Sequence, residues 1–266
     1  MVIYNILTSN KYDVCFLYTS STFPTILLLV YLKLVNKKIV LELNEYPYAP
    51  EGNKLTRINW IKRALQHINL KLVLPNVDGI VVISENLKKI VQKHGPNVKL
   101  LKVPILNDEN PSFDHIENSD RPGNYPYIFH AGSLNIQKDG ILEVFRAFGK
   151  AHNKFYEESG ERLKFILTSK KTYGYIWQKI EDILEKYDVE NEIIITGYLS
   201  DNELKRYMYH ANALVINKPA TFQNLYNFPT KLSDYLSSKT PVVVAAKGLE
   251  VNKFLENGKN AIVVNP

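Results

Sequence analysis

The stretch LYNFPTKLSDYLSSKTPVVVAA, residues 225–246, combines the signals for a helix start, a helix end and a buried strand. Pro229 suits the first turn of a helix, because the N–H that it lacks would have no partner there. We expect the helix to begin near Phe228, with Asn227 as its cap. The run of valines after Pro241 predicts a buried strand directly after this helix.

Short apolar runs alternate with helical segments along most of the chain. Strands are predicted at 12–18, 37–44, 77–84, 97–104, 127–132, 162–169, 191–197, 211–217, 240–246 and 260–264. Helices are predicted at 23–35, 55–74, 85–95, 138–152, 175–187, 200–210, 228–238 and 250–258. Strands separated by helices of this length indicate parallel sheets. The polar, aperiodic segment 107–126 is typical of a linker.

These patterns predict an α/β protein with two Rossmann-like, doubly wound parallel-sheet domains facing a cleft. We place the first domain at 1–107, the linker at 108–125 and the second domain at 126–266. Ligands of such sheets bind beyond the carboxyl ends of the strands, so the cleft is the expected site.

The bulk composition is that of an ordinary globular protein, with 266 residues, 45% hydrophobic and 23% charged. The net charge of +6 fits an anionic ligand, an acidic membrane surface or nucleic acid. No interleaved aromatic and basic patch supports nucleic acid. The single cysteine, Cys15, excludes a disulfide framework and suggests a small core residue in a reducing, cytosolic compartment. The apolar segment 23–35 is shorter than the roughly 20 residues that span a membrane.

The start of the 228–238 helix is a candidate anion site, because helix N-termini present free N–H groups and a positive dipole. Thr230 and Lys231 add a hydroxyl and a cation there. Asp234 lies one turn further on the same face, where a carboxylate can accept hydrogen bonds from a ribose diol. The structural alternative is that Pro229 only starts a helix and that Asp234 is a solvated charge.

The segment FHAGSLNIQKDG, residues 129–140, supplies a second candidate. Gly132 permits close backbone approach, and Lys138 can reach a phosphate. An ordinary strand-to-helix turn is the alternative, since the chain has no glycine-rich dinucleotide fingerprint and no P-loop. Taken together, the two segments favour a nucleotide diphosphate as ligand.

Two further residues follow strands. Glu45, in LELNEYPYAP, is either a residue of the cleft or a surface carboxylate without a role. His130 lies at a strand end, where a structural histidine is favoured over a catalytic one. No Asp-x-Asp and no histidine spacing suggests a metal site. Lysines and the helix start would instead neutralise a bound diphosphate.

The order and spacing of these stretches resemble the GT-B glycosyltransferases, specifically glycosyltransferase family 4. VDGIVVISENLKKI and KVPILND resemble the end of an acceptor domain and the crossover after it. FHAGSLNIQKDG resembles the opening of a donor domain, and NFPTKLSDYLSSKTPVVV resembles the donor-site helix. IIITGYLSDNELKRYMYHANALVIN resembles the base-binding loop and the element after it. In this family, segments also precede YDVCFLY and follow AIVVNP, so we expect an incomplete N-terminal domain.

The resemblance implies roles for individual residues. Lys138 would contact the donor diphosphate, Thr230 and Lys231 would hold the phosphates, and Asp234 would bind the ribose. The sequence departs from the family pattern where Ser133 replaces an arginine. The implied donor-binding residues are Gly132, Ser133, Lys138, Tyr198, Leu199, Tyr226, Phe228, Pro229, Thr230, Lys231 and Asp234. The implied catalytic residues are Glu45, Lys138 and Lys231.

Tyr198 and Leu199 would lie near the nucleobase. Tyr226 stands where the family has the first glutamate of a spaced pair, and the shorter Asp234 stands for the second.

We therefore expect a retaining glycosyltransferase that moves a sugar from a UDP-, GDP- or ADP-sugar to a polysaccharide or lipid-linked acceptor of a bacterial cell envelope. No cofactor and no metal are expected. The location would be cytoplasmic, with at most peripheral attachment to the inner membrane. The alternative is a non-catalytic fragment that binds nucleotide-sugar, or a subunit of a split glycosyltransferase.

Overall fold

The computed structural model describes residues 13–18, 23–46, 57–104, 113, 116, 120–132, 134–170, 174–246 and 248–264. The chain divides into two compact units. The first comprises Met1–Ile105 with Leu225–Phe228, and the second comprises Leu106–Asn224 with Pro229–Pro266. The predicted linker 108–125 falls largely outside the described residues, so the domain boundaries stay a prediction.

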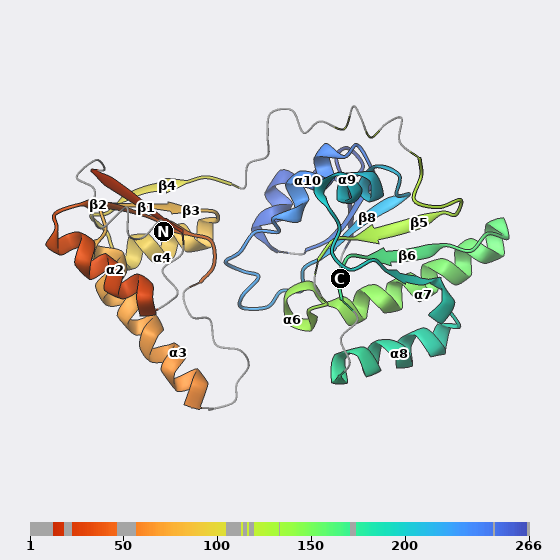
Figure 1. The fold of residues 1–266 in the computed structure, drawn as a ribbon, viewed down its shortest axis with the longest axis horizontal. Helices are drawn as coiled ribbons and strands as arrows, with labels where there is room; N and C mark the ends of the chain where they lie inside the picture. Colours follow the sequence, from red (N-terminus) through yellow and green to blue (C-terminus); the bar gives the residue numbers. More distant parts are fainter. Residues whose placement is uncertain are drawn as a thin grey trace. The chain divides into compact units, whose positions relative to one another are not determined.

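The first unit holds four parallel strands in the order β1-β2-β3-β4 (Figure 1). Its elements are β1 (Val14–Tyr18), α2 (Phe23–Leu34), β2 (Lys38–Leu43), α3 (Arg57–Ile68), β3 (Gly79–Val82), α4 (Glu85–His94) and β4 (Lys99–Lys102). Between α3 and β3 lie a π-helical turn (Asn69–Val73) and a 3₁₀ turn (Leu74–Asn76). In this order, each strand is added on the same side of the strand before it. Right-handed crossovers then place all the connecting helices on one face of the sheet. Figure 1 shows α2, α3 and α4 together on that face of the sheet.

The strand register separates the side chains of this sheet into a buried and an exposed set. Ile39 and Leu41 of β2 are fully buried beneath the helices. On the opposite face, Phe16, Tyr18 and Leu101 are 57%, 69% and 59% exposed. Within the described part of this unit, helices thus cover one face of the sheet.

The second unit holds six parallel strands in the order β10-β9-β8-β5-β6-β7. Its strands are β5 (Tyr127–His130), β6 (Lys164–Leu167), β7 (Ile193–Ile195), β8 (Ala213–Asn217), β9 (Val242–Ala245) and β10 (Ile262–Val264). Its helices are α6 (Ile136–Asp139), α7 (Ile141–Ser159), α8 (Tyr175–Tyr187), α9 (Asp201–Tyr209) and α10 (Lys231–Ser237), with 3₁₀ turns at Glu190–Glu192 and Glu250–Phe254. This strand order is the doubly wound order of dinucleotide-binding sheets.

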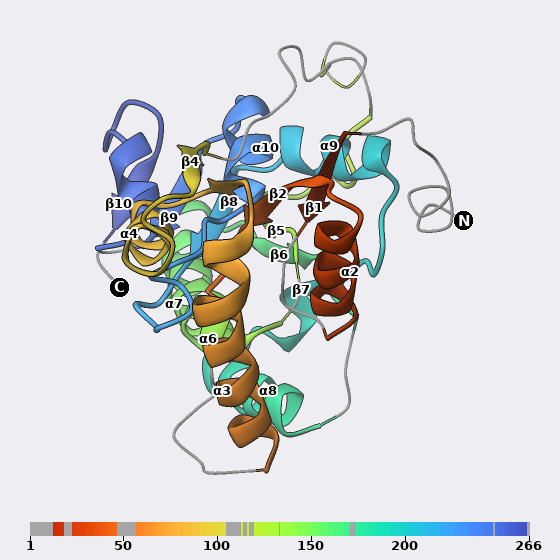
Figure 2. The same cartoon turned by 90° about the vertical axis from the view of Figure 1, so that its left-hand side faces the viewer.

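A hydrophobic core lies between the sheet of the second unit and the helix pair α7 and α8. Figures 1 and 2 both show these two helices side by side. Phe145 and Phe148 of α7 pack against Phe165 of β6, with ring centroids 5.4 Å and 5.2 Å apart. Ile180 of α8 is completely buried in the same core. The structure confirms the predicted α/β class with two Rossmann-like parallel sheets.

Several predicted helices differ from the observed ones; the predicted 250–258 helix, for example, is a 3₁₀ turn at Glu250–Phe254. α10 begins at Lys231 rather than near Phe228, so Asn227 does not cap it. The residue before it, Thr230, makes no capping hydrogen bond with its side chain. The predicted 55–74 helix loses its regular α-helical form after Ile68, because Pro75 lacks an N–H and its ring obstructs a preceding carbonyl.

Candidate functional site

Polar side chains gather at the carboxyl ends of β5 and β8, which are neighbours in the second sheet. β5 ends at His130 and β8 ends at Asn217. The chain continues from β5 to β6 on one side and from β8 to β9 on the other. The winding therefore reverses between β5 and β8, and doubly wound sheets bind their ligands at such a switch point.

The single helical turn α6 follows β5 at this point. The side chain of Asn135 caps the turn by accepting a hydrogen bond of 2.7 Å from the N–H of Lys138. Gly140 then adopts a left-handed conformation with φ of 51°, which ends α6 before α7 begins. The sequence predicted Lys138 at the opening of the long helix. That prediction is wrong, because the left-handed glycine separates the two helices.

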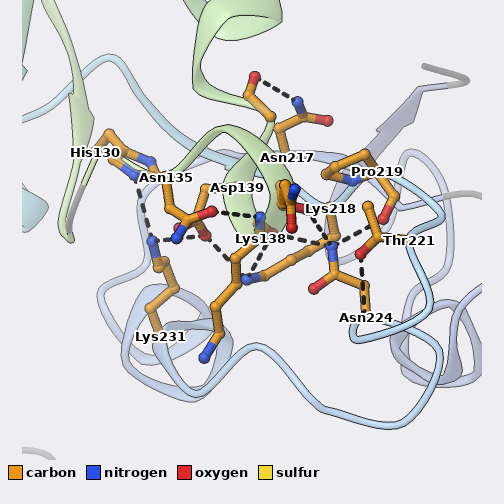
Figure 3. Close-up of polar contacts among 12 residues, drawn as sticks. His130, Asn135, Lys138, Asp139, Asn217, Lys218, Pro219, Thr221, Asn224 and Lys231 are labelled. Atoms are coloured by element: carbon orange, nitrogen blue, oxygen red, sulfur yellow. Dashed lines mark hydrogen bonds and ion pairs between the residues drawn. The ribbon is translucent and has the colours of Figure 1, made fainter. Parts of the chain in front are cut away.

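A buried carboxylate lies between two lysines in this region (Figure 3). Asp139 Oδ1 is 2.9 Å from Lys218 Nζ and 3.8 Å from Lys231 Nζ. The side chains of Asp139, Lys218 and Lys231 are only 6%, 4% and 17% exposed. Burying a charge is costly unless a partner compensates it, so Asp139 depends on these lysines.

His130 is completely buried beside the cluster. Its Nδ1 lies 3.0 Å from the carbonyl oxygen of Val215, which can only accept a hydrogen bond. The proton therefore sits on Nδ1, and Nε2 accepts from Lys231 Nζ at 3.4 Å. Burial, together with the positive charge of Lys231, lowers the pKa of His130 to about 4. The imidazole is thus neutral at pH 7.

Burial also lowers the pKa of Lys231, to about 8. The nearby cations Lys218 and Lys138 lower it as well, whereas the carboxylate of Asp139 raises it. Lys231 is therefore mostly charged at pH 7. Its ammonium contacts the neutral Nε2 of His130 and the carboxylate of Asp139, and this carboxylate lies closer to Lys218 than to Lys231.

Gly132 provides the space that the ammonium of Lys231 occupies. Gly132 has a φ of 139°, and a Cβ added there would lie 2.7 Å from Lys231 Nζ. Two hydrogen bonds fix this backbone, from the N–H of Gly132 to Thr168 Oγ1 at 2.9 Å and from the N–H of Ala131 to the hydroxyl of Tyr235 at 2.7 Å. The structure thus brings Gly132, Lys138 and Lys231 to one place around Asp139.

Other predicted residues of the second unit lie elsewhere in the fold. Pro229 is buried, whereas Thr230 and Asp234 are exposed, one just before α10 and one on it. Tyr198 is 89% exposed. Leu199 is half-buried, and both residues follow β7 at the edge of the sheet. The predicted Ser133 lies outside the described residues.

Glu45, Tyr226 and Phe228 belong to the first unit. Glu45 is exposed in the segment that follows β2. The ring of Tyr226 packs on that of Tyr46, with centroids 4.6 Å apart, and its carbonyl accepts a 2.8 Å hydrogen bond from Ser84 Oγ. Phe228 is buried. The roles implied for these three residues stay predictions.

Sequence reasoning missed Asp139, Lys218 and Asn224. The amide of Asn224 donates to the carbonyl of Lys138 at 3.0 Å and to that of Pro219 at 2.8 Å. For Lys218, the available signal was the polar pair Asn217-Lys218 at the end of the apolar run Ala213–Ile216. Polar residues at the carboxyl end of a strand next to a switch point are candidates for a site.

Among the helices in the described ranges, none combines the length and the apolar character that crossing a membrane requires. In the same part of the chain, histidine, cysteine, aspartate and glutamate side chains form no group of three or more that could hold a metal ion.

The sequence profile of the family described as glycosyl transferases group 1 matches residues 125–266, more than half of the chain. The chain therefore belongs to this family. Among curated proteins, no sequence matches it.

The fold is similar to those of several solved glycosyltransferases. The OtsA apo structure aligns with a TM-score of 0.69 at 13% identity, covering 98% of this chain and 64% of that one. For a UDP-forming α,α-trehalose-phosphate synthase from Burkholderia vietnamiensis, the TM-score is 0.70 at 14% identity, with 98% and 63% covered. For the pneumococcal O-GlcNAc transferase GtfA in complex with UDP and GlcNAc, it is 0.64 at 14% identity, with 100% and 48% covered. The chain thus has a GT-B fold and spans less than two thirds of the length of these structures.

Proposed function

We propose that this chain binds the nucleotide-sugar donor of a glycosyltransferase, which moves a sugar from a UDP-, GDP- or ADP-sugar to a polysaccharide or lipid-linked acceptor. The observation that carries the proposal is the ammonium of Lys231, which lies at the switch point of the sheet beside a neutral imidazole and belongs to a side chain that is only 17% exposed. Family membership supports it, as do fold neighbours that are UDP-forming or hold UDP.

The chemistry requires stabilisation of a leaving diphosphate. The bond between the anomeric carbon and the diphosphate oxygen breaks, and its electron pair stays on that oxygen. The acceptor hydroxyl forms the new bond to the anomeric carbon and passes its proton to the departing diphosphate. Cations held in a water-poor site stabilise this developing charge strongly, because they need no reorganisation. Lys138 and Lys231 are the residues that we assign to this role.

The other residues have supporting roles in the proposal. His130 is neutral at pH 7, so it orients Lys231 by accepting its hydrogen bond instead of adding charge. Asp234 would bind the ribose, with Tyr198 and Leu199 near the base. Glu45 would contact the sugar. Transfer with retention of configuration follows from the family resemblance alone.

We place this activity in the bacterial cytoplasm, in the synthesis of envelope polysaccharide, with at most peripheral membrane attachment. The free thiol of Cys15 supports a reducing compartment. Lysines would neutralise the diphosphate without a metal or other cofactor. A non-catalytic subunit that binds nucleotide-sugar is the second candidate.

Calorimetry with UDP, GDP and ADP, and with the matching nucleosides, tests the proposal. At least one diphosphate should bind the parent protein. Lys231→Ala should lower the affinity for that diphosphate roughly tenfold or more, because a charge-assisted contact contributes about 1.5–3 kcal/mol. The affinity for the matching nucleoside should be unchanged. Asp234→Asn should lower the affinity for the nucleoside and for the diphosphate alike.

The matched control is Lys154→Ala, which removes a lysine that is 76% exposed on α7. It should bind like the parent. Absence of diphosphate binding by the parent, or equal binding by parent and Lys231→Ala, would refute the proposed function. Sugar transfer by a parent that binds a donor would separate the enzyme from the non-catalytic subunit.

A further inference from the structure

Lys218 is the more buried of the two lysines that contact Asp139, and the proposed function gives it no role. Its side chain is 4% exposed, and its Nζ donates to Asp139 Oδ1 at 2.9 Å and to the carbonyl of Lys138 at 3.2 Å. A lysine in such a position loses its hydration, which is costly. The fold keeps it at the carboxyl end of β8, directly beside the candidate site.

Two contacts of Lys218, with the carbonyl of Lys138 and with Asp139, differ in whether another residue can replace Lys218. The carbonyl of Lys138 also accepts a hydrogen bond from Asn224 at 3.0 Å, so it keeps a partner without Lys218. Asp139 has a second cation, Lys231, but among the described residues none is as close as Lys218, since Lys231 Nζ is 3.8 Å away. Of these two contacts, the neutralisation of Asp139 is therefore the one that is harder to replace.

This neutralisation bears on Lys231, which shares the same carboxylate. The charged or titratable groups that face Lys231 from other elements are His130 from β5, Lys138 and Asp139 from α6, and Lys218 after β8. His130 is neutral at pH 7. Without Lys218, the full charge of Asp139 would act on Lys231, and the site would lose one positive charge.

We propose that Lys218 is a positioning residue that neutralises Asp139 and thereby leaves the charge of Lys231 to the donor diphosphate. The proposal rests on the proposed function for its ligand. It also makes a claim about the unliganded protein: Lys218 and Asp139 shift the titration of Lys231 in opposite directions.

NMR titration of the Lys231 ammonium in the unliganded protein tests that claim. In Lys218→Met, a repelling cation is gone and Asp139 acts on Lys231 alone, so the pKa of Lys231 should rise above its parent value. In Asp139→Asn, the attracting carboxylate is gone, so it should fall below the parent value. The double variant should titrate between the two single variants. A purely structural role for Lys218 would shift the pKa in the same direction in both single variants, or not at all.

Diphosphate affinity gives the second readout. At pH 7, Lys218→Met should lower the affinity for the diphosphate that binds the parent (UDP, GDP or ADP) roughly tenfold. The affinity for the matching nucleoside should be unchanged. Adding Asp139→Asn to Lys218→Met should restore the affinity to within about threefold of the parent, because it removes the carboxylate that captures Lys231. A double variant as weak as Lys218→Met would overturn the proposal.

The matched control is Lys164→Met in the same unit. Lys164 Nζ lies 2.6 Å from Glu192, a carboxylate that is 2% exposed, on the edge side of the sheet near β7. Loss of this pair should destabilise the fold and leave the diphosphate affinity unchanged. Equal loss of affinity in Lys164→Met and Lys218→Met would mean that any broken buried pair weakens binding, against the proposal.

The outcomes separate the two proposals. If the parent binds no nucleoside diphosphate, the proposed function fails, and the NMR titration still decides whether Lys218 and Asp139 control Lys231. If the parent binds but Lys218→Met binds equally well, the role of Lys218 is refuted and the proposed function stands.

Discussion

The pH dependence of diphosphate binding is the sharpest prediction from the charge of Lys231. Its pKa of about 8 makes the ammonium about nine-tenths charged at pH 7 and about one-tenth charged at pH 9. A bound diphosphate stabilises the charged form of Lys231, so binding raises this pKa. The affinity is therefore highest below pH 8, where Lys231 is already charged in the free protein. If only the charged form binds, the affinity falls about tenfold between pH 7 and pH 9, which is about 1.4 kcal/mol.

The ligand itself adds little to this change, because a terminal phosphate has already lost its second proton near pH 6. Calorimetry at pH 7, 8 and 9 on the parent and on Lys231→Met measures the effect. The parent should show the tenfold fall, whereas Lys231→Met should bind weakly and almost equally at all three values. A fall of the same size in Lys231→Met would refute the assignment of this titration to Lys231.

Three further predictions concern the same region. The pKa of His130, lowered to about 4, means that the unfolded chain binds more protons than the fold between about pH 4 and 6.5, so acidification through this window should cost up to about 3 kcal/mol of stability. Urea titrations at several pH values should show that loss in the parent and much less of it in His130→Asn, which keeps a donor for the carbonyl of Val215. Gly132→Ala should weaken diphosphate binding roughly tenfold, because its Cβ would displace Lys231 Nζ, whereas Gly160→Ala, where a Cβ meets nothing within 4 Å, should bind normally. Any sugar transfer should survive EDTA, and activity restored only by Mg²⁺ or Mn²⁺ would contradict the assignment of charge neutralisation to lysines.

Local patterns predicted most of the elements. The apolar runs of β5, β6 and β8 specify buried parallel strands, and the segment 175–187 was placed as the helix α8 with its observed bounds. The start of α10 was not predicted correctly, because Pro229 is compatible both with a first turn and with the turn that precedes a helix. In the structure, the carbonyl of Pro229 accepts from the N–H of Leu232 in that preceding turn.

The site was predictable only in part. Lys138 and Lys231 were recognised from the stretches around them, and the fold brings both near Asp139. Asp139 and Lys218 were missed because 79 residues separate them, and their pairing depends on the order of strands in the sheet. No local pattern distinguishes a buried aspartate with two lysine neighbours from a solvated one.

A structure of the protein bound to the nucleoside diphosphate that it prefers tests the central claim most directly. The account predicts a diphosphate oxygen within about 3 Å of Lys231 Nζ, beyond the carboxyl ends of β5 and β8, as a charge-assisted hydrogen bond requires. A diphosphate bound elsewhere, with Lys231 still held only by His130 and Asp139, would contradict it.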